Sequence, residues 1–141
     1  MSKLAITGLV VAGLLGAGVP VASSGSNVHR GTVQRPLTRN TTIKLFIATA
    51  VSRVHVERSY DLVTPAFRQG MTRRQWATGD IPVVPYFHIA LEHWKYAWRE
   101  GRERYYSVLL VNTRGEVATF LLGLVHPRRW LICYWMPFGY H

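Results

Sequence analysis

The stretch LVTPAFRQGMTRRQWATGDIPVVPY, residues 62–86, decides the fold because it forms a corner between two kinds of structure. Its first part predicts a short helix, since Thr64 can cap a helix and Pro65 suits the first helical position. Gly70 can adopt the left-handed conformation that ends such a helix. The corner therefore begins with a helix whose two ends are both specified.

The second part of the stretch predicts another short helix and then extended chain. Thr72 and Gln75 have the spacing of a capping box, and Gly79 supplies the stop. Pro82 and Pro85 disfavour helical geometry in the residues before them. A helical half thus precedes the corner, and a strand half follows it.

The residues before the corner predict an amphipathic helix. Apolar residues recur with the period of one helix face at Ile43, Phe46, Ile47, Ala50, Val51 and Val54. Thr41 or Thr42 is expected to cap this helix. Three basic residues fall off the stripe and are expected in solvent: Lys44, Arg53 and Arg58.

The residues after the corner predict about four antiparallel strands. Aromatic residues at 94, 96 and 98 alternate with other residues, which is the period of a half-buried strand. Further strands are expected at 105–111, 117–125 and 130–136, with turn signals between them. Helices followed by an antiparallel sheet indicate an α+β fold, with the helices packed on one face of the sheet.

Three segments divide the chain. Residues 1–22 carry one positive side chain, Lys3, followed by a long uncharged run, which predicts either a cleaved signal peptide or a membrane anchor in the form of a hydrophobic helix. Residues 23–40 are polar with scattered arginine and are expected to form a flexible basic spacer. Residues 41–141 are expected to form the α+β domain, located outside the cell membrane or secreted.

The composition limits the chemistry. The formal net charge is +10, so an acidic partner or surface is expected. Cys133 is the only cysteine, which excludes an intramolecular disulfide and a cysteine zinc site. In an apolar strand, that cysteine is expected to be a small buried hydrophobe.

Three blocks carry a resemblance to a known family: SYDLVTPAFRQGMTRRQW, GDIPVVPY and GLVHPRRWLICYWMP. They resemble a group of exported or membrane-anchored actinobacterial domains that are similar to the nuclear-transport-factor-like cone, also called ketosteroid-isomerase-like or cystatin-like. The resemblance covers about residues 42–137. It implies a curved sheet wrapped around a helix and enclosing a cavity. It implies no single activity, because that cone hosts enzymes, ligand binders and assembly modules.

An aspartate at the mouth of such a cavity can act as a general base in the cone enzymes. Asp61 and Asp80 are the acids nearest the expected cavity, and His88 follows along the chain. The alternative for both aspartates is to cap backbone donors. No catalytic motif of the cone enzymes matches this sequence, so no catalytic residue is carried over.

Metal and cofactor sites are not predicted. His88, Glu92 and His93 invite a metal site, but only a helix would bring the first two together, and no third ligand is near. Seven aromatic residues could line a ligand pocket or, alternatively, fill the core: Tyr60, Trp76, Tyr86, Trp94, Trp98, Tyr105 and Trp135.

Arginine residues form three groups that could contact an anionic partner. Two are the pairs Arg73–Arg74 and Arg128–Arg129, and the third comprises Arg99, Arg102 and Arg104. Anionic lipid or a wall polymer suits an exported protein better than nucleic acid, for which no recognised motif is present. A solvated basic face is the alternative.

The sequence therefore favours a non-catalytic extracytoplasmic binding or assembly module at the cell membrane, with a protein partner or a homodimer through the sheet face. One alternative is a small cone-fold enzyme, an isomerase or cyclase, with Asp61 or Asp80 as base. The other is a basic surface that binds anionic lipid or polymer. The enzyme predicts an open apolar cavity with a carboxylate inside, whereas the assembly module predicts a cavity filled by aromatic side chains.

Overall fold

A computed structural model describes residues 35–139 of the chain. The predicted hydrophobic N-terminal helix, and the predicted spacer up to residue 34, lie outside the described residues. The chain divides after Arg35, and the residues from Pro36 onward form one compact unit. In the part that the structure describes, no helix is both long and apolar enough to cross a membrane.

The amphipathic helix forms, with two corrections at its ends. Helix α2 spans Arg39–Phe46 and continues as a π-helical turn, η2, over Ile47–Val51. Its cap is Thr38 rather than Thr41 or Thr42, because the Thr38 side chain accepts a hydrogen bond from the Thr41 backbone N–H. Val54, which the stripe assigned to the buried face, lies beyond the end of η2 and is exposed.

Arg53 also departs from the prediction that it is solvated. The residue has a positive φ of 57°, and its guanidinium group turns inward instead of into solvent. It donates hydrogen bonds to the backbone oxygens of Ala50, Gly79 and Val83. A single side chain therefore ties the end of the helix to the extended run after the corner.

The structure of the corner, residues 62–86, agrees closely with the prediction from the sequence. A 3₁₀-helix, η3, spans Val56–Leu62, and two short helices follow it, α3 at Pro65–Arg68 and α4 at Arg73–Ala77. Thr64 caps α3, and Thr72 forms the predicted capping box of α4 with Gln75. The left-handed conformation after α3 begins at Gln69, one residue before Gly70.

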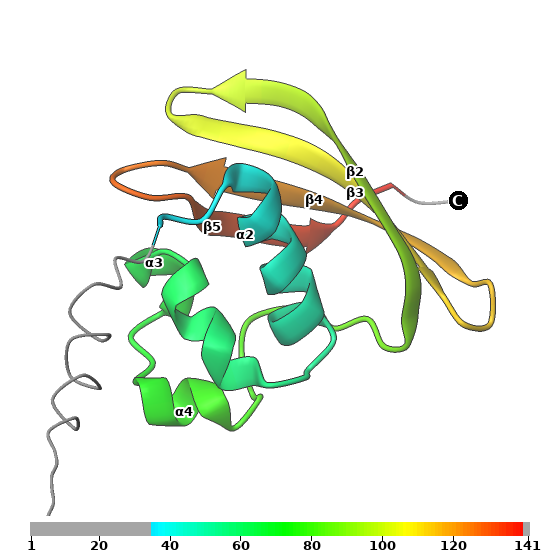
Figure 1. Cartoon of the computed structure of the whole chain (residues 1–141), viewed down its shortest axis with the longest axis horizontal. Helices are drawn as coiled ribbons and strands as arrows, with labels where there is room; N and C mark the ends of the chain where they lie inside the picture. The colour runs from blue at the N-terminus through cyan, green and yellow to red at the C-terminus, as the bar shows by residue number, and fades with distance from the viewer. Residues whose placement is uncertain (1–34, 140–141) are drawn as a thin grey trace, which may run out of the picture. The chain divides into compact units, whose positions relative to one another are not determined.

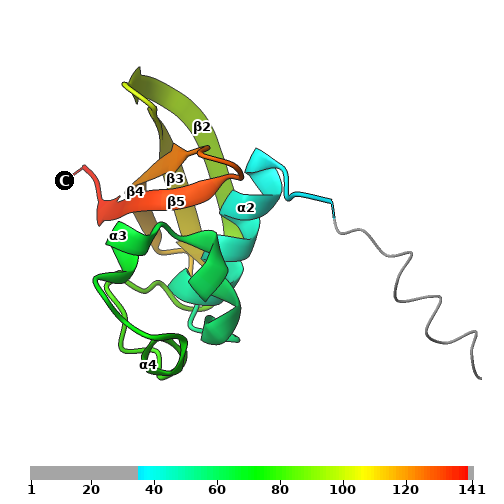
Figure 2. The same cartoon turned by 90° about the vertical axis from the view of Figure 1, so that its left-hand side faces the viewer.

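Four antiparallel strands make one sheet in the order β2–β3–β4–β5. Their bounds are Ile89–Glu100, Glu103–Asn112, Val117–Val125 and Leu131–Pro137. The sheet is curved, and the helices lie on one of its faces (Figures 1 and 2). The α+β class and the four-stranded meander are thus confirmed.

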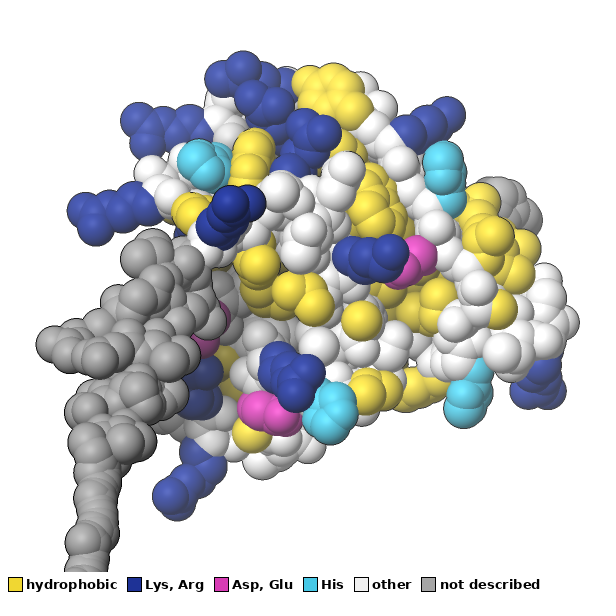
Figure 3. Space-filling model, viewed as in Figure 1, with side chains coloured by type: hydrophobic (Ala, Val, Ile, Leu, Met, Phe, Trp, Pro, Cys, Tyr) yellow, Lys and Arg dark blue, Asp and Glu magenta, His cyan; other side chains and the backbone are white. Residues whose placement is uncertain are grey.

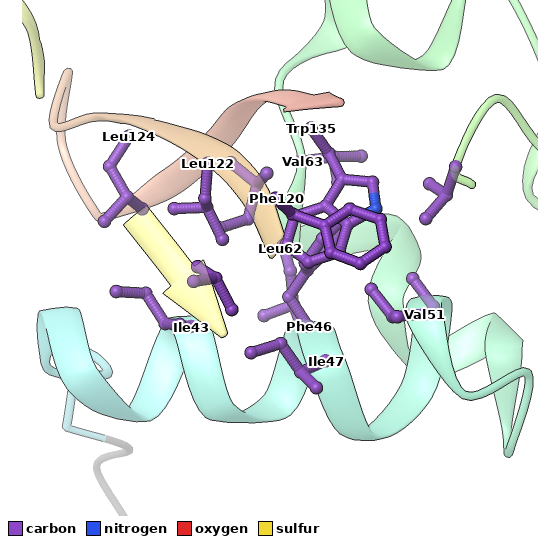
Figure 4. Packing of buried hydrophobic residues seen from close by; sticks show 14 of the residues in the cluster. Ile43, Phe46, Ile47, Val51, Leu62, Val63, Phe120, Leu122, Leu124 and Trp135 are labelled. Atoms are coloured by element: carbon purple, nitrogen blue, oxygen red, sulfur yellow. The ribbon is translucent and has the colours of Figure 1, made fainter. Parts of the chain in front are cut away.

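The core lies between the helices and the inner face of the sheet. Figure 4 shows Ile43, Phe46 and Ile47 of the first helix directed toward Leu122 and Trp135 of the sheet. The rings of Phe120 and Trp135 are stacked with their centroids 4.4 Å apart. Aromatic side chains thus contribute to a core that is otherwise formed by Ile, Leu, Val and Ala side chains.

Cys133 lies at an irregularity of β5, where Gly123 pairs with Tyr134 but Leu124 pairs with Ile132. Burial raises the pKa of the Cys133 thiol to about 12. A thiol with such a pKa is almost entirely protonated at neutral pH and is therefore a poor nucleophile.

Candidate functional site

A basic pocket lies where the β2–β3 and β4–β5 turns meet. Seven residues line this hollow of about 550 Å³: Arg99, Arg102, Arg104, Val125, His126, Pro127 and Trp130. We refer to it as the arginine pocket. Figure 3 shows dark-blue side chains gathered at the end of the molecule where these two turns lie.

Strand pairing explains why the basic groups share one side of this hairpin. Arg99 lies directly opposite Arg104 in the β2–β3 ladder, and the next pair toward the turn is Glu100 with Glu103. Successive side chains of a strand point to opposite faces, so the two arginines share one face and the two glutamates the other. Charge is therefore sorted by face, and no acid lines the arginine pocket.

Within residues 35–139, no Asp or Glu side chain forms an ion pair with these arginines. The ion pairs among residues 35–139 are His55–Glu57 and Arg73–Asp61, and both lie on the helical side of the domain. Like charges held together in a hollow raise the local positive potential, because the low-dielectric walls focus the field. The arrangement is suited to an anion.

The aromatic wall of the pocket is in contact with its charges. The Arg104 guanidinium carbon lies 5.6 Å from the centroid of the Trp130 ring, within the range of cation–π attraction. The His126 ring lies 4.5 Å from the same indole. These contacts orient Arg104, while Arg99 and Arg102 are exposed. The Arg99 Nε donates a hydrogen bond to the Gly101 backbone oxygen, at 3.0 Å, which leaves its two terminal amino groups for a ligand.

A fourth arginine extends the basic surface along the inner face of β3. Arg39, at the start of α2, lies 5.7 Å above the ring of Tyr106, which is two residues from Arg104 on the same strand face. Among the described residues, the Arg39 Nε and the buried Tyr106 hydroxyl have no hydrogen-bond partner. Both of these polar atoms are buried, so the contact of Arg39 with this strand is made through its guanidinium face on the Tyr106 ring.

The four paired arginines predicted to contact an anionic partner lie in two places, on α4 and in the β4–β5 turn. The Arg73 Nη2 group donates to both carboxylate oxygens of Asp61, at 2.8 and 3.0 Å, and Arg74 is exposed on α4. Arg128 and Arg129 occupy the β4–β5 turn beside the arginine pocket, although neither lines it. Arg129 also donates a hydrogen bond to the backbone oxygen of Asp61, at 3.3 Å.

The weak catalytic candidates do not meet in a cavity. Asp61 is exposed and its carboxylate pairs with Arg73, which differs from the backbone capping expected for it. Asp80 is exposed and lines a shallow polar depression beside α4. His88 is exposed with a positive φ of 56°, in the connection before β2. The enzyme hypothesis placed one of these aspartates inside the domain, and neither lies there.

The seven aromatic pocket candidates are scattered as well. Trp76 and Trp135 are buried in the core, and Tyr86 and Trp94 pack against its edge. Tyr60 lies between the guanidinium groups of Arg68 and Arg73, at 4.2 and 4.5 Å. The remaining two candidates, Trp98 and Tyr105, belong to the outer face of the sheet.

That outer face carries a row of aromatic side chains across the strands. Trp98 stacks on Tyr105, which meets Tyr134 edge-on at 5.8 Å. Gly123 lies beneath them, since an added Cβ there would approach Tyr105 Cε1 to 3.1 Å and Tyr134 Cβ to 2.8 Å. The missing side chain therefore lets the rings close over the strand.

A second hollow, of about 450 Å³, separates the end of the helix from the start of β2. We call it the β2 groove. Its lining is mostly apolar and includes Ile47, Ala48, Val54, Phe87, Leu91 and the single acid Glu92. Burial raises the pKa of the Glu92 carboxyl above its ordinary value, and the nearby Lys44 opposes that rise.

Sequence reasoning missed the groove because its walls come from residues far apart in the chain. It considered Glu92 only as a metal ligand beside His88 and His93, and strand geometry places Glu92 and His93 on opposite faces. Within residues 35–139, no three His, Cys, Asp or Glu side chains form a cluster that could hold a metal ion. The sequence favoured a core position for Trp130 and not a site role, although its position after the HPRR turn placed it beside the arginines.

Comparison with known proteins gives no relative from which a role could be transferred. No family model, curated protein or solved structure matches the chain. The geometry of the two hollows and of the sheet face is therefore the basis for any functional conclusion.

Proposed function

We propose that this domain is a non-catalytic binding module that recognises an anionic group, either phosphate or carboxylate, through the arginine pocket. The observation that carries the proposal is that three arginines share one hollow without an acid in its lining. Guanidinium groups present planar, forked donors that match such oxyanions. The exposed turns would allow an extended polymer or a lipid headgroup to reach all three.

Two further parts of the proposal come from the sequence. A cone-like fold, related to the nuclear-transport-factor-like group, accords with the curved sheet and the helix across its inner face. A location outside the cell membrane, with a tether or after secretion, rests on residues 1–22. A basic pocket would suit the anionic lipids and polymers found there.

An assembly role is a second candidate, and the outer face of the sheet supports it. Trp98, Tyr134 and Met136 are exposed on a face that no described helix covers. Exposed apolar surface of this kind is typical of protein contact sites. The core between the helices and the sheet, packed with aliphatic and aromatic side chains, accords with the same role. A protein partner, or a homodimer through this face, stays a prediction.

The proposal is tested with inorganic polyphosphate as the probe and the full chain as the protein. The double variant Arg99→Ala/Arg102→Ala removes the two exposed arginines of the pocket and leaves Arg104 on Trp130. Each basic group near an anionic surface contributes about 1 kcal/mol, so we expect the affinity to fall by about tenfold or more. Binding should also weaken with added salt, less steeply for the variant.

The matched control is Arg58→Ala/Arg114→Ala, which removes the same charge from exposed sites outside the pocket. It should change the affinity by less than about twofold, because screening limits charge effects to roughly 8 Å at physiological salt. Equal losses for both double variants would show that net charge acts instead of the pocket. The pair Arg128→Ala/Arg129→Ala tests the neighbouring turn, and unchanged affinity would remove that pair from the site.

A further inference from the structure

The β2 groove has properties that the proposed function does not use. Two side chains at its mouth are apolar and about half exposed: Val54 at 51% and Phe87 at 50%. Isolated exposed apolar residues need no explanation, but these two border one hollow together with Ile47 and Ala48 and form a patch with them. Its volume of about 450 Å³ falls within the range of pockets for small ligands.

The backbone around the groove is irregular on both sides. The helical wall includes η2, Ile47–Val51, whose π-helical turn is a feature found frequently at functional sites. Two of the four non-glycine residues with positive φ within residues 35–139, Arg53 and His88, adjoin or line this hollow. Such conformations cost about 1 to 3 kcal/mol each and persist where the surroundings impose them.

The groove contains a carboxylate without a partner among the described residues. Glu92 lies on the inner face of β2, opposite Leu110, and is partly buried. It accepts no hydrogen bond from the described residues and forms neither of their two ion pairs. A partly buried acid is costly unless a cation or donor meets it. The site therefore offers one negative group at the base of an apolar surface.

We infer that the β2 groove binds an apolar primary amine, whose ammonium group pairs with Glu92 while its carbon chain contacts Val54 and Phe87. The ligand class follows from charge complementarity, since an anion would meet the carboxylate and a purely apolar molecule would leave it unpaired. Lys44 and His88 are the basic groups near this acid. Neither lies within 4.0 Å of its oxygens, so the carboxylate is open to a ligand.

The positive charge of the domain does not prevent this binding. Glu92 and Arg99 are seven residues apart on β2, which corresponds to about 23 Å at roughly 3.3 Å per residue. That separation exceeds the screening length of about 8 Å at physiological salt. The arginine pocket therefore has little effect on a cation in the groove, and the two sites are independent.

The test uses n-hexylamine and hexan-1-ol as probes with the full chain at pH 7, followed by NMR chemical-shift titration. The two probes share one carbon chain, and only the amine carries charge. We expect hexylamine to shift groove resonances, and Glu92→Gln to lower its affinity by about fivefold, as for a charged hydrogen bond that is partly solvated. The affinity for hexanol should stay the same.

Two further variants make the outcome unambiguous. Ala48→Leu fills the groove from an exposed helix position and should abolish the shifts caused by both probes. Glu100→Gln removes the same charge from an exposed position at the far end of β2 and should change neither affinity. The inference is overturned if Glu92→Gln leaves hexylamine affinity unchanged, or if hexylamine still binds Ala48→Leu as it binds the native chain.

Discussion

Strand β2 begins at one hollow and ends at another of opposite character. At its start, the β2 groove is mostly apolar, is bounded by a helix end, and contains one acid. At its end, the arginine pocket is bounded by two turns and contains three arginines and one histidine. The groove is made by tertiary packing, whereas the three arginines of the pocket are brought together by the local pairing of one hairpin. This difference decides which mutations should affect each site.

The largest expected effect is on the groove side, at Arg53. Its guanidinium bonds to three backbone oxygens, and both neighbours, Ser52 and Val54, line the groove. Arg53→Ala leaves those carbonyls without donors, so we expect the free energy of unfolding to fall by about 2 to 3 kcal/mol. Hexylamine affinity should fall as well, and polyphosphate affinity should not change. Chemical denaturation and the two titrations measure these effects.

A second substitution at the same position separates the contribution of the Arg53 side chain to stability from the steric cost of the backbone conformation. Arg53→Gly also removes the guanidinium but accepts a φ of 57° without steric cost, so it should be less destabilising than Arg53→Ala by about 1 kcal/mol. Arg58→Ala, at an exposed position, should have almost no effect. If all three variants unfold alike, Arg53 does not link the helix to the extended run.

The next effect in size concerns the wall of the arginine pocket. Trp130→Ala removes the ring that contacts both Arg104 and His126, so we expect a loss of about 1 to 2 kcal/mol in stability. Without this support Arg104 is less well oriented, and polyphosphate affinity should fall by about threefold, equivalent to roughly 0.7 kcal/mol. Thermal unfolding and the polyphosphate titration measure the two effects.

Trp130→Phe should recover most of the lost affinity, because a smaller aromatic ring can still face the guanidinium. Trp98→Ala is the matched control, since that indole is partly exposed on the opposite face of the same sheet. It should leave polyphosphate binding intact. A loss of affinity on Trp98→Ala as large as that on Trp130→Ala would mean that general loosening of the sheet, and not the pocket wall, controls binding.

The two hollows also differ in how far the sequence predicts them. Arg99, Arg102 and Arg104 are close in the chain, so the charge cluster is evident from the order of the residues alone. The hairpin register that sorts them from Glu100 and Glu103 requires only the turn at Gly101. Local information therefore suffices for much of the pocket, as it does for the capping box at Thr72.

The groove depends on information that periodicity does not contain. The stripe from Ile43 predicts a regular helix to Val54, but the π-helical turn and the inward bend at Arg53 alter the direction of the last residues. The side-chain hydroxyls of Thr49 and Ser52 donate to the backbone oxygens of Leu45 and Ile47, and such bonds compete with regular helix geometry. Packing across the domain then determines where the last residues of this helix contact β2.

The smallest expected effect tests whether the groove acid is free. Burial raises the pKa of Glu92, so the folded state holds its proton more tightly than the unfolded state does. The stability from this proton is complete below the unfolded pKa of about 4.3 and is lost as pH rises through the folded pKa. Glu92→Gln cannot ionise. It should therefore match the native chain at pH 3 and exceed it at pH 7 by about 0.5 kcal/mol, a figure reduced for partial solvent exposure.

Denaturation at both pH values measures this difference, with Glu100→Gln as the exposed control. A lower stability of Glu92→Gln at pH 7 would mean that attraction to Lys44 outweighs the cost of burial. The carboxylate would then already have a partner, and the two ends of β2 would differ in charge without differing in openness to a ligand.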